Sequence, residues 1–413
     1  MATLDLTEFE PLLKRLYPGN THLDLAYENH VALGLLNKDN NFQGEAVKVP
    51  VATTRPQNRS ATFAKAKGSG GGGKTSQQQF FLITTEDNYN FGFVDNKTIQ
   101  VSKSNKGAIV DALQYETDMA IKALGRNLNI DIFGNGSGLI GQRASISTNT
   151  ITLVNVQDVV KFEIGMTLVA SPNADGSSPR SGTAEVTAVD RDSGLVTVDN
   201  AAAIISFADN DYLFVDGDIG LKLKGFDAWL PATAPTSTPF FNVDRSVDPT
   251  RLGGVRYDGT NLTHREALIK CAARVHREGG MPDYVLMNTD DYAELSAELD
   301  SDIVYDNAVA QYYKVDKERA SIAYEAIVLN TPHGKMKIMA DRDCPVGVAY
   351  MLQMDTWTLH SVGDVVSIFN TDGLPFLRAS DFDGIEIRVH SYSQLACDAP
   401  GKNARLTLPA LSA

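Results

Sequence analysis

The feature that most limits how this chain can fold is a long polar segment enclosed by two short apolar runs. Val47–Val51 and Phe80–Thr84 have the β-branched and aromatic composition of strands. The segment between them is polar and contains the glycine run Gly68–Gly73, which offers almost nothing apolar to bury. The pattern therefore predicts a two-stranded arm with a flexible tip. Because an isolated two-stranded hairpin is marginal in water, such an arm needs support from the chain or from a partner.

The same glycine run matches a nucleotide-binding motif. Gly68–Thr75 reads GSGGGGKT and fits G-x-x-x-x-G-K-[ST], in which backbone amides hold phosphates and the lysine reaches the β- and γ-phosphates. That chemistry needs a buried strand before the loop and a helix after it. Ala61–Lys67 is too polar for a central strand, and Ser76–Phe81 favours a strand. These flanking segments do not fit a P-loop, so we expect no catalytic residue and no cofactor. A nucleotide-dependent enzyme that uses Gly68–Thr75 is the alternative from a different functional class.

The net charge restricts the partners that this chain can bind. The sequence has 51 acidic and 37 basic residues, a net charge of −14, which argues against a protein that holds nucleic acid through a basic face. Lysines in the arm either keep an exposed loop soluble or meet acidic patches on a neighbouring subunit. On the second interpretation the arm tip is an assembly interface formed by Lys65, Lys67, Gly68, Gly70, Gly73 and Lys74.

The sequence offers no pattern typical of a metal site or a disulfide framework. Acidic residues between Asp190 and Asp218 lack the alternating ligands, glycine and distal glutamate of a calcium loop. Cys271, Cys344 and Cys397 are far apart and odd in number, which favours a reducing compartment. The first residues do not form a secretory signal, and no apolar run approaches the roughly 20 residues that span a bilayer. We therefore expect no metal and no membrane partner.

A short amphipathic helix is predicted near the start of the sequence. Thr7 and Glu10 have capping-box spacing, and Pro18–Asn20 ends the element. A single helix cannot bury its own apolar stripe, so this helix must dock on the rest of the chain or on a neighbouring subunit. We interpret the stripe as a second assembly interface, formed by Phe9, Leu12, Leu13, Leu16 and Tyr17.

The remaining sequence predicts an α+β protein. Ser104–Leu128 has helical spacing, and the block Ala144–Asp218 is all-β, either a small barrel or a sandwich. Its clearest part is the hairpin Val186–Val198, and later Thr263 caps a helix. The elements expected after that helix are a strand Tyr284–Met287, a helix Asp290–Leu299, and strands near Lys335–Met339, Val346–Leu352, Trp357–His360 and Ile385–His390.

The order of these parts resembles the Hong Kong 97-type major capsid protein of tailed bacteriophages. The similarity covers nearly the whole chain except the β-rich insert, which some members of that family carry and others lack. Individual segments are also similar, namely Pro11–Tyr17, Pro282–Asn288 followed by Tyr292 and Leu295, Gly334–Ile338 followed by Asp341–Pro345 and Gly347, and Leu395–Leu406 with Asn403.

The resemblance implies a capsid fold with an N-terminal arm, an extended β-hairpin loop, a long spine helix, peripheral and axial domains, and a β-rich insertion domain. The expected boundaries are 1–44 for the N-terminal arm, 45–102 for the extended loop, 103–143 for the spine helix and peripheral domain, 144–218 for the insertion domain, 219–282 for the peripheral domain, 283–380 for the axial domain, and 381–413 for C-terminal peripheral and axial strands.

The resemblance also implies a function and partners. Copies of the chain would form the pentamers and hexamers of an icosahedral virion capsid, assembled in the cytoplasm of a bacterial host. Scaffold, portal and decoration proteins are further candidate partners, and packaged double-stranded DNA would lie inside without sequence-specific contacts. An encapsulin-like compartment is the nearest alternative, although that group usually has a shorter extended loop and lacks such an insert.

Some members of the family join subunits through an isopeptide bond between a loop lysine and an asparagine, promoted by a buried glutamate. Lys65, Lys67 or Lys74 offers an amine for this reaction, but no asparagine or glutamate stands out as its partner. We therefore expect subunits that are not covalently cross-linked.

Overall fold

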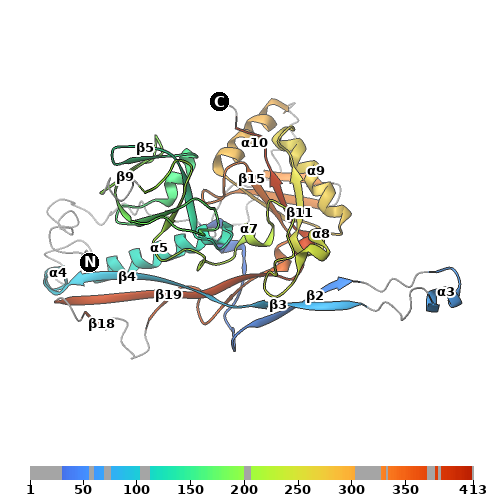
Figure 1. Ribbon diagram of the computed structural model, residues 1–413, viewed down its shortest axis with the longest axis horizontal. Helices are drawn as coiled ribbons and strands as arrows, with labels where there is room; N and C mark the ends of the chain where they lie inside the picture. Colours follow the sequence, from blue (N-terminus) through green and yellow to red (C-terminus); the bar gives the residue numbers. More distant parts are fainter. Residues whose placement is uncertain are drawn as a thin grey trace, which may run out of the picture.

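The computed structural model describes residues 30–54, 60–68, 76–102, 112–199, 206–302, 327–331, 334–369, 377–379 and 383–411. Strands within these residues form two six-stranded sheets, a closed barrel and a separate two-stranded arm, and helices pack between them (Figure 1). The fold is α+β, as the sequence predicts.

The first sheet is organised by one long strand, β19 (Gly384–Cys397). β4 (Glu86–Asp95) pairs with it antiparallel along its first part, and β16 (Trp357–Ser361) pairs with its last part. The shorter members are β1 (Asn37–Asp39), β17 (Ser367–Ile368) and β18 (Leu377–Arg378). Residues 86–95 were expected in the arm, but their partner is β19, so the arm ends near Ile83 rather than Ser102.

Helix α5 (Ala112–Phe133) lies along β4 and β19 and corresponds to the predicted spine helix (Figure 1). Its buried face includes Ala120, Leu124, Leu128 and Ile132, which recur every four residues, the helical spacing. The described helix continues past the predicted end at Leu128 because Ile132 and Phe133 are still on the buried face. Residues 103–111, in which the predicted helix begins, lie outside the described residues.

The second sheet has the strand order β11-β20-β15-β12-β14-β13. Its strands are β11 (Val255–Asp258), β12 (Tyr284–Met287), β13 (Ile327–Thr331), β14 (Gly334–Ala340), β15 (Val348–Leu352) and β20 (Ala404–Thr407). Helices α9 (His264–Arg277) and α10 (Thr289–Asp302) pack on it. The predicted cap of α9 is confirmed, because the Glu266 amide donates to the Thr263 hydroxyl.

The second sheet and its helices do not coincide with residues 283–380, the expected axial domain. β11 and α9 precede residue 283 and still belong to it, and β20 comes from the last residues of the chain. β16 and β17 lie within 283–380 but belong to the first sheet. The expected boundaries divide the chain into consecutive domains. The chain crosses between the two sheets repeatedly, so neither sheet is formed by one continuous segment.

The β-rich insert is a closed barrel with the strand order β10-β5-β6-β9-β8-β7. Its strands are β5 (Leu139–Ser147), β6 (Thr150–Leu153), β7 (Thr167–Ser171), β8 (Ala184–Asp190), β9 (Leu195–Val198) and β10 (Tyr212–Val215), with the 3₁₀ helix η2 (Val156–Lys161) between β6 and β7. The predicted hairpin is confirmed as β8–β9, with Asp190 opposite Leu195 and Gly194 at φ +67° in the turn. The barrel begins at Leu139, five residues before the expected boundary.

An aromatic cluster joins the spine helix to both sheets. Phe226, in α7 (Phe226–Trp229), contacts Trp357 of β16 edge-on at a centroid distance of 4.9 Å and Tyr350 of β15 at 5.6 Å. Phe133 at the end of α5 is 6.0 Å from Tyr350. These large rings are buried together, so the relative positions of the sheets are fixed by dense packing. The remaining short helices are α2 (Val31–Leu35), α3 (Phe63–Gly68), α4 (Asn96–Ser102), η3 (Arg245–Val247), α8 (Pro249–Gly253), η5 (Met354–Thr356) and η6 (Pro400–Lys402).

Candidate assembly interface

The arm consists of β2 (Val47–Thr54) and β3 (Gln77–Ile83), which pair antiparallel from Val47–Ile83 to Thr54–Gln77. It extends away from both sheets and the barrel (Figure 1). The ladder confirms the predicted pairing of the two apolar runs. A two-stranded element needs further contacts to hold it in place.

The base of the arm is held by the body of the subunit. Phe81 is fully buried and meets Trp229 edge-on with ring centroids 5.0 Å apart. The Leu82 amide donates to the carbonyl of Phe241 at 3.0 Å, and the Arg251 guanidinium donates to the carbonyl of Thr53 at 3.3 Å. This contact with the aromatic residues and α8 supplies the support that an isolated hairpin lacks.

Beyond the base, the arm leaves apolar and basic side chains in solvent. Phe63, the first residue of α3, is 81% exposed, and Phe80 on β3 is 42% exposed. Lys65 and Lys67 of α3 are also exposed. A Phe side chain with this exposure loses the free energy of burial, which is roughly 1.5–3 kcal/mol for a complete burial. An exposed aromatic residue among lysines is therefore typical of a surface completed by another molecule.

The structure contradicts the nucleotide-binding interpretation of Gly68–Thr75. A P-loop follows a strand and opens a helix. Here helix α3 precedes the motif and ends at Gly68, and strand β3 follows it. This order is the reverse of the one that presents a helix N-terminus to phosphates. Of the predicted tip residues, Lys65, Lys67 and Gly68 lie in α3, whereas Gly70, Gly73 and Lys74 lie outside the described residues.

The predicted apolar stripe of Phe9, Leu12, Leu13, Leu16 and Tyr17 also lies outside the described residues. The structure describes the chain from His30, where the short helix α2 packs against α5. β1 then pairs parallel with β16. The segment that follows the predicted N-terminal helix is thus fixed to the body of the subunit.

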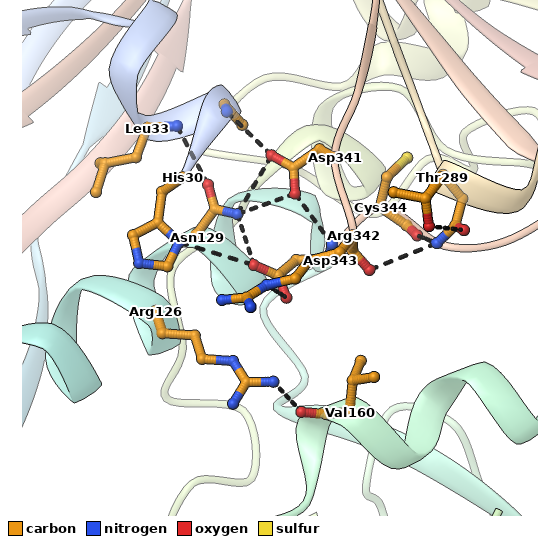
Figure 2. Close-up of polar contacts among 12 residues, drawn as sticks. His30, Leu33, Arg126, Asn129, Val160, Thr289, Asp341, Arg342, Asp343 and Cys344 are labelled. Carbon is orange, nitrogen blue, oxygen red and sulfur yellow. Dashed lines mark hydrogen bonds and ion pairs between the residues drawn. The ribbon is translucent and has the colours of Figure 1, made fainter. Parts of the chain in front are cut away.

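A buried polar cluster holds this segment in place (Figure 2). The side-chain amide of Asn129 on α5 donates to Asp343 at 2.7 Å and to both oxygens of Asp341 at 3.2 and 3.3 Å. Its Oδ1 accepts from the Leu33 amide at 3.2 Å, and Asp341 accepts from the Ala32 amide at 3.1 Å. Because carboxylates accept and backbone amides donate, only this orientation of Asn129 satisfies all partners. We call His30, Asn129, Asp341 and Asp343 the junction cluster.

Burial of the ionisable groups in the junction cluster costs free energy. Burial raises the pKa of Asp341, and the neighbouring Asp343 raises it further, against the hydrogen bonds that the carboxylate accepts. His30 lies with Nδ1 3.9 Å from Asp343, and burial lowers the pKa of His30 despite that negative charge. Two buried carboxylates are tolerated here because Asn129 donates to both of them and the backbone amides of Ala32 and Asp343 donate to Asp341.

The spine helix also holds the barrel. Arg126 of α5 is buried, and its Nη1 lies 2.7 Å from Oε1 of Glu163, just after η2. Its Nη2 donates to the carbonyl of Val160 (Figure 2). Arg126 and Asn129 lie one turn apart on the same helix, so α5 connects the N-terminal segment, the second sheet and the barrel.

The part of the chain that the structure describes has no cluster of three or more histidine, cysteine, aspartate or glutamate residues placed to bind a metal ion. Its three cysteines are free and buried. Among the described helices, none has the length and apolar character needed to cross a membrane.

Comparison with solved structures gave matches over nearly the whole chain. A chain of the cyanophage A-1(L) capsid matches with a TM-score of 0.54 and 12% identity, covering 96% of this chain and 98% of that chain. The SrpI encapsulin of Synechococcus elongatus PCC 7942 matches with a TM-score of 0.48 and 8% identity, over 100% of this chain and 98% of that chain. A chain of Mycobacterium phage Bobi matches with a TM-score of 0.43 and 14% identity, over 99% and 100%.

The cyanophage comparison defines the class of fold. Nearly all of this chain and nearly all of that capsid chain are included in the match, so the resemblance to tailed-phage capsid proteins is confirmed at the level of the fold. Comparison of the sequence with protein-family models and with curated proteins gave no match.

Proposed function

We propose that this chain is a major capsid protein that self-assembles into the pentamers and hexamers of an icosahedral phage head enclosing double-stranded DNA. The observation that carries the proposal is the arm: its base is anchored in the subunit, and its tip presents Phe63, Lys65 and Lys67 to solvent. The capsid fold supports the same conclusion. The base of the arm is supported within the subunit, whereas the exposed tip gains stability when a neighbouring subunit covers it.

On this proposal the parts of the chain have distinct roles. The second sheet with α9 and α10 is the axial domain, and the first sheet with α5 is the peripheral domain. The arm tip, including the expected contacts Lys65, Lys67, Gly68, Gly70, Gly73 and Lys74, lies on a neighbour. The N-terminal stripe Phe9, Leu12, Leu13, Leu16 and Tyr17 forms a further contact between subunits. The junction cluster supports that role by fixing the chain at His30.

The proposed contacts are individually weak, which suits assembly of a closed shell. Burial of Phe63 or Phe80 on a neighbour would contribute about 1.5–3 kcal/mol at most, and exposed ion pairs about 1 kcal/mol or less. Subunits placed wrongly can then leave before many such contacts accumulate. The net charge of −14 supports a shell that does not hold DNA tightly.

The test is a variant without the arm tip. The β2–β3 ladder ends at Thr54–Gln77, so residues 55–76 can be replaced by an Asn-Gly turn without disturbing the anchored base. We expect this variant to fold as a soluble subunit with the stability of the full chain and to form no shells, as measured by sedimentation velocity. Shells formed by the variant at the same concentration as by the full chain would refute the role of the arm.

A further inference from the structure

The arm and the barrel carry opposite charges. Residues 47–83 contain six basic residues and no acidic ones, although the whole chain is acidic. Residues 139–215, which form the barrel, contain nine acidic and four basic residues. Charge complementarity of this kind directs which surfaces meet and in which orientation. The two surfaces are therefore candidates for one interface.

One rim of the barrel combines exposed apolar and acidic side chains. Val156, the first residue of η2, is 41% exposed, and Val154, two residues before it, is 45% exposed. The β8–β9 turn beside them presents Asp192 to solvent. The two loops are in contact, because Gly194 lies against Val156 and the Leu153 amide donates to the Gly194 carbonyl at 3.2 Å. We call Val154, Val156, Asp190 and Asp192 the acidic rim.

The rim has a fixed shape. Asp190 accepts hydrogen bonds from the amides of Asp192 and Ser193 at 3.1 and 3.4 Å, which holds the turn. The carboxylate of Asp192 does not accept these hydrogen bonds, and the residue is exposed. A rigid turn that presents a carboxylate next to two exposed valines is suited to a partner with an apolar residue next to a cation.

The arm tip has that complementary pattern. Phe63 and Lys67 are four residues apart in α3, so they lie on the same side of the helix. Both are exposed. Phe63 would cover Val154 and Val156 while Lys67 meets Asp192.

The two surfaces cannot meet within one subunit. α3 lies at the far end of the arm, and the barrel lies at the opposite end of the molecule, above β4 and α5 (Figure 1). We propose that helix α3 of one subunit binds the acidic rim of the barrel of a neighbouring subunit. This inference rests on the proposed function and names the surface on which the arm tip is completed.

Disulfide trapping tests the contact directly. The three native cysteines are buried, so cysteines introduced at the surface are the ones available for oxidation. The double variant Lys67→Cys/Asp192→Cys is assembled and then oxidised, and the particles are run on a non-reducing denaturing gel. We expect a ladder of linked subunits. The matched control Lys67→Cys/Asp175→Cys places the second cysteine in another exposed loop of the same barrel and should remain largely monomeric.

A charge exchange gives an independent test if a cysteine variant does not assemble. Lys67→Glu and Asp192→Lys should each raise the concentration needed for assembly by about threefold, the effect of one exposed ion pair. The combined variant should return to within about twofold of the original chain. The inference is overturned if particles form normally but show no disulfide linkage above the control. It is also overturned if the combined variant assembles no better than either single variant. Neither result would contradict the proposed shell function. A full chain that never forms particles would instead refute the proposed function itself.

Discussion

The ring of Phe81 meets the indole of Trp229 edge-on, with centroids 5.0 Å apart and planes at 76°. The next residue along the chain, Phe80, points to the other side of the strand and is 42% exposed. Two adjacent phenylalanines thus differ in their surroundings, since Phe81 fixes the arm to its own subunit and Phe80 stays exposed.

This pair gives the first prediction. Phe81→Ala should lower the free energy of unfolding of the unassembled subunit by about 3–5 kcal/mol, the usual cost of emptying a buried aromatic site. Phe80→Ala should cost about 1 kcal/mol or less, because it removes only a half-exposed ring and its contact with Lys48. Guanidinium denaturation below the assembly concentration measures both. Equal losses would contradict the division of roles.

The junction cluster gives the second prediction. Asn129→Leu should destabilise the subunit by about 2–4 kcal/mol, because Asp341 and Asp343 lose a donor while remaining buried. Asn129→Asp should be worse at pH 7, since it adds a third buried carboxylate.

The loss in Asn129→Asp should shrink as the pH falls from about 7 to 5, in keeping with the raised pKa of Asp341. Protonation removes the repulsion between buried carboxylates, so the folded state gains relative to the unfolded chain. Denaturation at both pH values measures this change. An Asn129→Asp variant as stable as the original chain at pH 7 would show that the carboxylates are not held as described.

His264 gives the third prediction. Its Nδ1 lies 3.0 Å from Oε1 of Glu298, and its Nε2 lies 3.8 Å from Oδ1 of the buried Asp291, so the imidazole connects α9 to α10. The contacts with Asp291 and Glu298 raise the pKa of His264 above its usual 6.5, although burial opposes them.

The sign of the pH dependence follows from that shift. The folded state holds the proton more tightly than the unfolded chain, so this stabilisation is complete below pH 6.5 and is lost as the pH rises through the raised pKa. We expect the original chain to lose stability as the pH rises above about 6.5, and His264→Gln to be less stable at pH 6 with a flatter profile. Parallel profiles for the two chains would contradict the prediction.

The fourth prediction concerns covalent linkage. Lys65, Lys67 or Lys74 could supply the amine of an isopeptide bond, but no asparagine or glutamate stands out in the sequence as its partner. We therefore expect mature particles, boiled in denaturant under reducing conditions, to run as a single band at the mass of one subunit. A ladder of multiples would contradict this expectation.

The elements that the sequence predicts well are those with local signals. Thr263 with Glu266, the turn at Gly194, and the four-residue spacing of Leu124, Leu128 and Ile132 each specify a local structure through neighbours in sequence. The fold class follows from the order of such elements.

No local pattern in the sequence predicts the pairing of distant strands or the junction cluster. Glu86–Asp95 reads as a strand, but its partner β19 lies almost 300 residues later, and nothing local distinguishes it from the arm. Asn129 meets Asp341 and Asp343 across more than 200 residues. The one available clue was a polar residue on the buried face of the spine helix, beside Leu128, because such a residue requires partners.

Electron microscopy of the purified full chain over a concentration series shows whether this protein forms shells. We expect closed shells, tubes, or rings of five and six subunits that become more abundant with concentration. Compact monomers or dimers at every concentration, with the arm intact, would contradict the proposal that this chain assembles a capsid by itself.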